Sequence, residues 1–96
     1  MADGGRSNAD IAKRLNALIE ALDLKPVSFA ALVNVSQPAI SNYLSGLRRP
    51  DLDVGIAIQV KTGATLDWLY LGDRSGLPAR LLGSLPDLSA PAEKAI

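Results

Sequence analysis

Apolar residues recur every three or four positions between Ile11 and Leu22, which predicts an amphipathic helix. Ser7 or Asn8 can cap its start, and Asp10 suits the positive end of the helix dipole. We expect this helix to end near Leu24. The apolar stripe consists of Ile11, Leu15, Leu18, Ile19 and Leu22. The charged side chains expected to lie off the stripe are those of Lys13, Arg14 and Glu20.

Two shorter helices are predicted next, joined by a tight turn. Pro26 is well suited to the first turn of a helix, and Asn34 can end that helix because asparagine tolerates a left-handed backbone. Ser36 can cap the following helix, in whose first turn Pro38 does little harm. Gly46 then ends this third helix.

The sequence over residues 52–60 gives conflicting signals for a strand and for a helix. By period alone it predicts a strand, since the apolar residues alternate strictly: Leu52, Val54, Ile56, Ile58 and Val60. A single strand needs a partner, however, and the chain has no second alternating run. Asp51 can cap a helix here and Gly63 can end it, so we favour a helix, in which Gly55 costs about 1 kcal/mol relative to Ala. A fifth helix is expected over residues 65–72, with Thr65 as its cap.

The chain is therefore expected to be all-α, with five helices and a short C-terminal extension. Residues 1–8 are expected to be a flexible lead, residues 9–72 the domain and residues 73–96 the extension. A short helix over 78–85 is expected in the extension, followed by a disordered tail beyond Pro86. Its leucines are expected to pack on their own domain, and Trp68 is expected in the core.

The composition excludes several classes of function. A chain of 96 residues suits one domain, and with aromatic residues at 4% the core depends on aliphatic side chains. The absence of Cys and His removes thiol and imidazole catalysis and the usual zinc and haem ligands. We see no catalytic, metal or cofactor site, and no small-molecule ligand is evident. The polar start lacks the apolar segment of a signal peptide, so we expect a cytoplasmic protein without membrane association.

Charge is distributed unevenly although the formal net charge is zero. Residues 26–47 carry no charge, and the wider window 24–50 contains no Asp or Glu but holds Lys25, Arg48 and Arg49. Six of the ten acidic residues come after residue 50. A local excess of positive charge beside an uncharged stretch is typical of a surface that approaches nucleic acid.

The third helix separates its residues into two faces. Ile40, Tyr43 and Leu44 lie on one side, and the other side carries Gln37, Ser41, Asn42 and Ser45, with Pro38 beside them. An uncharged face of amides and hydroxyls can enter the major groove of DNA, where an amide pairs with the N6 and N7 edge of adenine. The same face could instead be ordinary solvated helix surface, and the acid-free window favours the first interpretation.

The segment PVSFAALVNVSQPAISNYLSG resembles the helix-turn-helix of the Cro/phage-repressor (XRE-type) regulators. Ala30 matches the small residue of its second helix, and Asn34 stands where the family usually has Gly. The exit GLRRP and the stretch up to residue 72 are similar to the family's later segments, so the resemblance covers about residues 9–72. The apolar anchor positions match Phe29, Val33, Val35, Ile40 and Tyr43.

The resemblance implies a compact five-helix bundle of the lambda-repressor-like type. It also implies double-stranded DNA as the partner, with the helix at 37–45 in the major groove. The base-reading positions it implies are Gln37, Pro38, Ser41 and Asn42. The phosphate-binding positions it implies are Lys25, Ser28, Ser36, Ser45, Arg48 and Arg49. Pro38 departs from the family, whose residue here is often polar. An alternative role for one of the two arginines is an ion pair with Asp51 or Asp53.

The leading hypothesis is a sequence-specific transcriptional regulator, a phage-like repressor that binds a pseudo-palindromic operator as a homodimer. The alternative is a protein-interaction module on the same fold, an antitoxin or antiactivator, which the zero net charge favours. An enzyme is not indicated. Expected dimer contacts are Leu66, Leu69, Tyr70, Leu71 and the 77–85 stretch.

Overall fold

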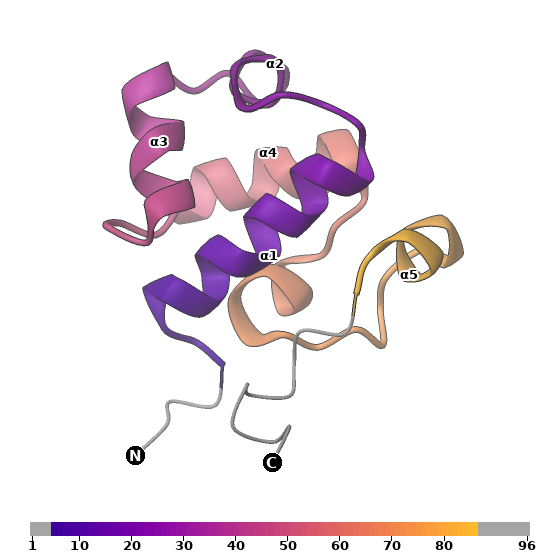
Figure 1. Cartoon of the computed structure of the whole chain (residues 1–96). Coiled ribbons are helices and arrows are strands. Elements are labelled where there is room, and N and C mark those ends of the chain that lie inside the picture. Colours follow the sequence, from indigo (N-terminus) through magenta and orange to yellow (C-terminus); the bar gives the residue numbers. More distant parts are fainter. Residues whose placement is uncertain (1–4, 87–96) are drawn as a thin grey trace.

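Six helical elements form the part of the protein that the computed structural model describes, residues 5–86 (Figure 1). No strand occurs within these residues, and the predicted all-α bundle is confirmed. The predicted tail beyond Pro86 and the first four residues of the lead lie outside the described range. In chain order the elements are α1 (Asn8–Ala21), α2 (Pro26–Val33), α3 (Gln37–Ser45), α4 (Leu52–Thr62), the π-helix η1 (Asp67–Leu71) and α5 (Ala79–Ser84).

Helix α1 begins as predicted and ends earlier than predicted. The Ser7 hydroxyl accepts a hydrogen bond from the backbone N–H of Asp10 at 3.0 Å, which caps the helix. Asp23 adopts a left-handed backbone (φ 57°), and the N–H of Leu24 donates to the carbonyl of Ile19 at 3.1 Å. This turn stops α1 at Ala21, so the predicted end near Leu24 was three residues late. The apolar pattern misled the prediction because Leu24 packs against the core from the loop.

Helices α2 and α3 form the predicted pair joined by a tight turn. Asn34 is left-handed (φ 61°, ψ 48°), and the N–H of Val35 donates to the carbonyl of Ala30 at 2.9 Å. The Ser36 hydroxyl accepts from the N–H of Ala39 at 3.2 Å and caps α3. Gly46, at φ 83°, ends α3 as predicted.

Residues 52–62 form helix α4, and not a strand. The Asp51 carboxylate accepts from the N–H of Val54 at 2.9 Å, and Gly63 ends the helix at φ 88°. Ile58 is fully buried, whereas Leu52, Ile56 and Val60 remain exposed; the alternation therefore reflected two sides of a helix. Figure 1 shows α4 behind α1, with α3 and α2 beside and above them.

The predicted fifth helix is a π-turn rather than an α-helix. Thr65 caps it as predicted, because its hydroxyl accepts from the N–H of Trp68 at 3.0 Å, and Gly72 ends it at φ 82°. The wide turn exposes the carbonyl of Leu69, which accepts a hydrogen bond from the Arg14 guanidinium at 2.9 Å. This contact between distant parts of the chain is a physical reason for the departure from α geometry.

The core runs through the bundle and continues into α5. Trp68 is buried as predicted and shares one cluster with Ile11, Leu15 and Phe29. Helix α5 lies within the predicted range, and the leucines of that region that join the same cluster are Leu77, Leu81 and Leu85. These three residues and Leu69 are buried within one chain, so the prediction that they form dimer contacts was wrong.

Candidate nucleic-acid interface

Helix α3 presents an uncharged polar face to solvent. Gln37, Ser41 and Ser45 are exposed and lie four residues apart, which places them on one side of a helix with 3.6 residues per turn. On the opposite side, Ile40 and Tyr43 are buried in the core. The packing of α3 against α1 and α2 therefore orients the polar side chains outward.

The other two predicted base-reading residues occupy different positions on α3. Pro38 is exposed in the first turn of the helix, whereas Asn42 is half-buried. The Asn42 carbonyl accepts from the Ser45 hydroxyl at 3.1 Å and from the N–H groups of Leu47 and Arg48 at 3.1 and 3.3 Å. The backbone of Asn42 thus closes the loop after α3, and its side chain lies at the edge of the exposed face.

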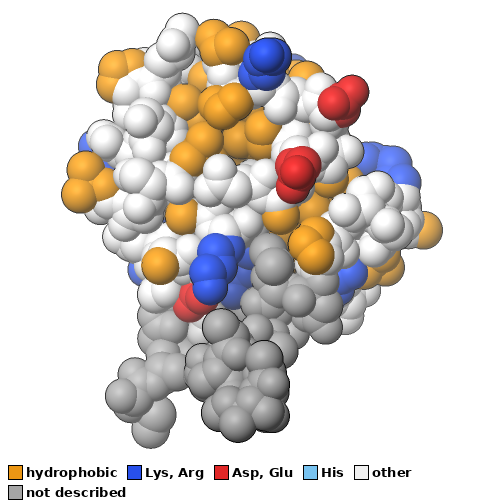
Figure 2. Space-filling view, viewed as in Figure 1, with side chains coloured by type: hydrophobic (Ala, Val, Ile, Leu, Met, Phe, Trp, Pro, Cys, Tyr) orange, Lys and Arg blue, Asp and Glu red, His pale blue; other side chains and the backbone are white. Residues whose placement is uncertain are grey.

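An apolar hollow of about 430 Å³ adjoins this face, between the first turn of α2 and helix α3. Figure 2 shows apolar side chains gathered in a hollow on the side of the molecule that α1, α2 and α3 form. The amide of Gln37 and the hydroxyl of Ser41 stand at the same hollow. The residues that line it are Pro26, Val27, Gln37, Ile40, Ser41, Leu44 and Ser45.

The predicted phosphate-binding residues all lie at the surface. Lys25 is the exposed residue directly before α2, and Ser28 is exposed in the first turn of that helix. Ser36 accepts a hydrogen bond in its capping role and keeps its hydroxyl proton for a further acceptor. Ser45 instead donates its hydroxyl proton to the carbonyl of Asn42. Ser36 is therefore the better placed of these two serines to donate to a phosphate.

The two arginines after α3 differ in their contacts. Arg49 donates from Nε to the Asn8 side chain at 2.7 Å and from Nη2 to the Arg6 carbonyl at 2.9 Å. Within residues 5–86 the Arg48 side chain forms no hydrogen bond or ion pair and extends into solvent. Among residues 5–86 neither arginine forms an ion pair with Asp51 or Asp53, so the alternative role predicted from the sequence was wrong.

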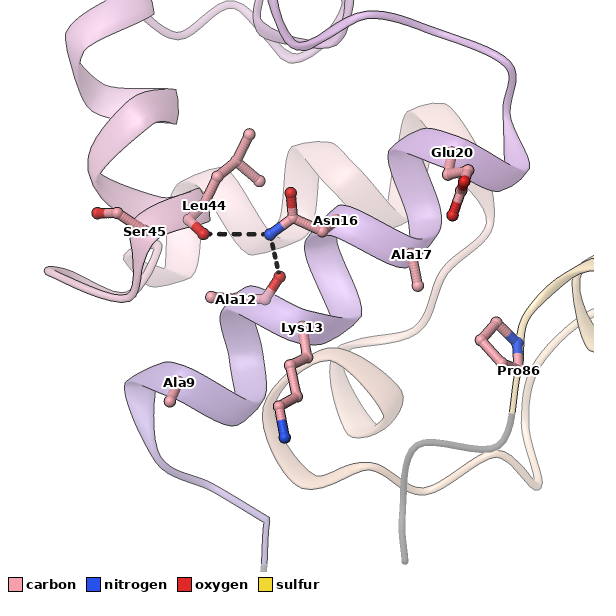
Figure 3. Close-up of a pocket in the computed structure, with 9 residues that line it drawn as sticks. All are labelled: Ala9, Ala12, Lys13, Asn16, Ala17, Glu20, Leu44, Ser45 and Pro86. Atoms are coloured by element: carbon pink, nitrogen blue, oxygen red, sulfur yellow. Dashed lines mark hydrogen bonds between the residues drawn. The ribbon is translucent and has the colours of Figure 1, made fainter. Parts of the chain in front are cut away.

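Two polar side chains that fix α1 were not identified from the sequence. Asn16 donates from Nδ2 to the carbonyls of Ala12 and Leu44, at 2.8 and 3.1 Å, and so joins α1 to the end of α3 (Figure 3). Arg14 was expected off the apolar stripe but is buried, and donates to the carbonyls of Leu69 and Gly5. No local sequence signal identifies either role, because the acceptors at Leu44 and Leu69 come from other parts of the chain.

A second, more open cleft of about 530 Å³ lies between α1 and the end of α3 (Figure 3). It holds the Lys13 amine and the Glu20 carboxylate, and its floor consists mainly of alanine side chains. These two opposite charges do not make a site for a charged ligand. The residues that line the cleft are Ala9, Ala12, Lys13, Asn16, Ala17, Glu20, Leu44, Ser45 and Pro86.

Tyr70 connects η1 to the start of α4. Its hydroxyl donates towards the carbonyls of Pro50 and Asp51, at 2.8 and 3.0 Å. Burial of the phenol, together with the nearby Asp51 carboxylate, raises the pKa of Tyr70 from 10.0 to about 12. The phenol therefore stays neutral and holds the segment that follows the Arg48–Arg49 loop.

No helix between residues 5 and 86 is both long and apolar enough to cross a membrane. In the same range no group of three or more acidic side chains is arranged to hold a metal ion.

A left-handed turn between two short helices, followed by a capped helix with an exposed uncharged face, defines a helix-turn-helix domain. A family model described as helix-turn-helix matches residues 15–69, more than half of the chain. The chain belongs to the helix-turn-helix family of the Cro/phage-repressor (XRE) type, whose members are DNA-binding regulators. Searches of the curated proteins and of the solved structures find no match.

Proposed function

We propose that the protein is a sequence-specific repressor of transcription that reads the major groove of duplex DNA with α3. The observation that supports this most is the exposed, uncharged polar face of α3 within a stretch that has no acidic residue between positions 24 and 50. Amides and hydroxyls can donate and accept on base edges, and no carboxylate repels the phosphates.

The proposed base contacts follow from the chemistry of each side chain. Gln37 is the principal reader, since its exposed amide matches the N6 and N7 edge of adenine. Ser41, one turn further along the same side, contacts a neighbouring base, and the ring of Pro38 packs against a thymine methyl group. Asn42 reads at the edge of the face, where its half-buried side chain limits it to one orientation.

The proposed phosphate contacts surround α3. Lys25 and Ser28 at the start of α2, and Ser36 at the start of α3, bind one stretch of the DNA backbone. Arg48 and Arg49 bind another stretch, and Ser45 contributes weakly because its proton is already donated. Such contacts set affinity and register, and carry no sequence information directly.

A salt titration of binding to random duplex DNA tests the role of the arginines. Each phosphate contact contributes about 0.9 to the slope of log K against log salt, which is roughly a three- to fourfold change in affinity between 50 and 200 mM. We expect Arg48→Ala to lower the slope by about 1 without changing the melting temperature. Replacing both arginines should lower the slope by about 1–2 and also lower the melting temperature, because Arg49 has two hydrogen bonds to lose.

The matched control is Lys61→Ala, which removes one exposed positive charge from α4, away from α3. It should leave the slope as in the parent. A double arginine variant that keeps the parent slope would show that the arginines do not neutralise phosphates.

The alternative function is a protein-interaction module, an antitoxin or antiactivator. The apolar hollow beside α3 and the zero net charge favour it, since phosphodiesters gain nothing from an apolar surface. This alternative predicts that the protein does not retard DNA at low salt. Selection of bound sequences from a random DNA pool would establish the operator and its symmetry if the leading proposal holds.

A further inference from the structure

The apolar hollow beside α3 is lined by two helices and carries no charge. Val27, in the first turn of α2, lines it from one helix and is 48% exposed. The half-buried Leu44 lines it from α3, together with Ile40, which belongs to the core and is only 3% exposed. The described lining residues include no Lys, Arg, Asp or Glu. The hollow therefore suits an apolar group and offers no ion-pair partner to a charged ligand.

The position of the hollow makes it part of the proposed DNA interface. Gln37 and Ser41, two of the proposed base-reading residues, line the hollow and are exposed. Lys25 and Ser28, which we propose to bind phosphates, lie within two residues of Val27 along the chain. A duplex that contacts all four side chains would cover the opening of the hollow. The hollow is thus continuous with the reading face.

The major groove presents one kind of apolar group at the edges of its bases. This group is the 5-methyl group of a pyrimidine, which thymine carries and which cytosine carries only when it is methylated. Phosphates and the N–H and C=O groups of the bases are polar and gain nothing from the hollow. A water molecule takes about 30 Å³ and a methyl group is little larger. A hollow of about 430 Å³ therefore has room for the methyl groups of neighbouring bases.

We propose that the hollow receives the 5-methyl group of a pyrimidine, and that Val27 is a specificity-determining residue. This inference rests on the proposed function. The phosphate contacts of α2 carry no sequence information directly, whereas Val27 gives α2 a part in base reading. Because the Gln37 amide borders the hollow, the methylated pyrimidine lies at or next to the base pair that Gln37 reads. Pro38, the other proposed methyl contact, is outside the lining of the hollow, so the two contacts are separate.

Uracil scanning of the operator tests whether a methyl group is read. The operator selected from a random DNA pool is synthesised with deoxyuridine in place of one thymidine at a time. Each replacement removes one methyl group and keeps the base pair. We expect a loss of affinity of about three- to fivefold, the value of one buried methyl group, at a thymine beside the base pair where Gln37→Ala relaxes specificity. The Pro38 contact should give a separate sensitive position.

Methylation of cytosine distinguishes the two sources of the methyl group. The sensitive thymine is replaced by cytosine, with guanine opposite, in an unmethylated and a 5-methylated duplex. These two duplexes differ only in the methyl group, so the methylated duplex should bind about three- to fivefold more tightly. A loss with uracil but no gain with 5-methylcytosine would overturn the inference for methylated cytosine.

Variants of Val27 assign the methyl effect to the hollow. Val27→Thr keeps the shape of the side chain but adds a hydroxyl, and should reduce the ratio of thymine to uracil affinity to about 1 at that position. Val27→Ile keeps the lining apolar and should retain the ratio. Since Val27 is half exposed, melting curves should show both variants as stable as the parent.

Two further variants complete the comparison. The matched control is Val60→Thr, the same change at a 74% exposed valine near the end of α4, which should retain the ratio at every position. Pro38→Ala should abolish the effect of uracil only at its own position. If Pro38→Ala, and not Val27→Thr, abolishes the effect beside the Gln37 base pair, the hollow is not the receiver.

The outcomes separate failure of this inference from failure of the proposed function. Equal affinity for thymine and uracil at every position would overturn the inference, as would a Val27→Thr variant that retains the full ratio. In both cases the parent still binds its operator, so the repressor proposal stands. A parent that retards no duplex at low salt refutes both proposals, and leaves the hollow to a protein partner.

Discussion

Gly55→Ala tests the packing of α4 against η1. A Cβ added at Gly55 would lie 2.7 Å from the Tyr70 hydroxyl oxygen, 2.9 Å from Tyr70 Cε2 and 3.0 Å from Leu66 Cδ2. Real Cβ atoms essentially never show contacts below 3.0 Å, so the Tyr70 ring must move. Movement of the ring displaces the hydroxyl that binds the carbonyls of Pro50 and Asp51.

The expected change in stability combines opposing terms. Alanine improves the helix propensity of α4 by about 1 kcal/mol relative to glycine. Overpacking costs about 1–3 kcal/mol, and each hydrogen bond of Tyr70 that weakens costs about 1 kcal/mol more. The steric terms are larger than the gain in propensity. We therefore expect Gly55→Ala to lower the free energy of unfolding by about 1–3 kcal/mol.

Urea denaturation of the parent, both single variants and the double variant measures the coupling. In a Tyr70→Ala background the space is free, so Gly55→Ala should be neutral or should stabilise by up to about 1 kcal/mol. The coupling between the two positions should then be about 1–4 kcal/mol. Equal effects of Gly55→Ala in both backgrounds would refute the reasoning, as would a single variant more stable than the parent.

Two further predictions concern α3 and the Tyr70 phenol. Gln37→Ala and Asn42→Ala should each cost roughly 1–3 kcal/mol of operator binding and much less of binding to random DNA, with little change in melting temperature. Tyr43→Ala should instead destabilise the fold and weaken binding to all DNA sequences together. Binding to a panel of single-base operator changes distinguishes these two patterns. Tyr70→Phe should flatten the loss of stability at alkaline pH. The pKa of Tyr70 is raised to about 12 from 10.0, so its contribution is complete below pH 10 and is lost as the pH rises through about 12, which denaturation across that range would measure.

The boundaries of α2, α3 and α4 could be predicted because their signals are local. The caps at Ser36 and Asp51 bind backbone groups three residues away, and the left-handed turns at Asn34 and Gly46 depend on the residue itself. Helical periodicity likewise predicted that Gln37 and its neighbours one turn apart would face outward. None of these predictions needs knowledge of the rest of the chain.

Features that depend on distant partners could not be predicted. The buried position of Arg14 depends on a carbonyl of η1 that comes 55 residues later, and that contact accompanies a π-turn where an α-helix was expected. The contact of Arg49 with Asn8 joins residues 41 positions apart. The apolar alternation along α4 suggested a strand because three of its five apolar side chains are exposed and are not part of the core. A pattern of apolar residues does not show which of them the core buries.

The contacts of Arg49 have a practical consequence for work with this protein. A guanidinium has five N–H donors, and Arg49 uses two of them on Asn8 and the Arg6 carbonyl, which leaves three for a phosphate. In the proposed complex the same side chain holds residues 6–8 and a phosphate at once. Truncation up to Asn8 would remove both contacts and release that guanidinium. Binding constants should therefore be compared between proteins with identical amino termini.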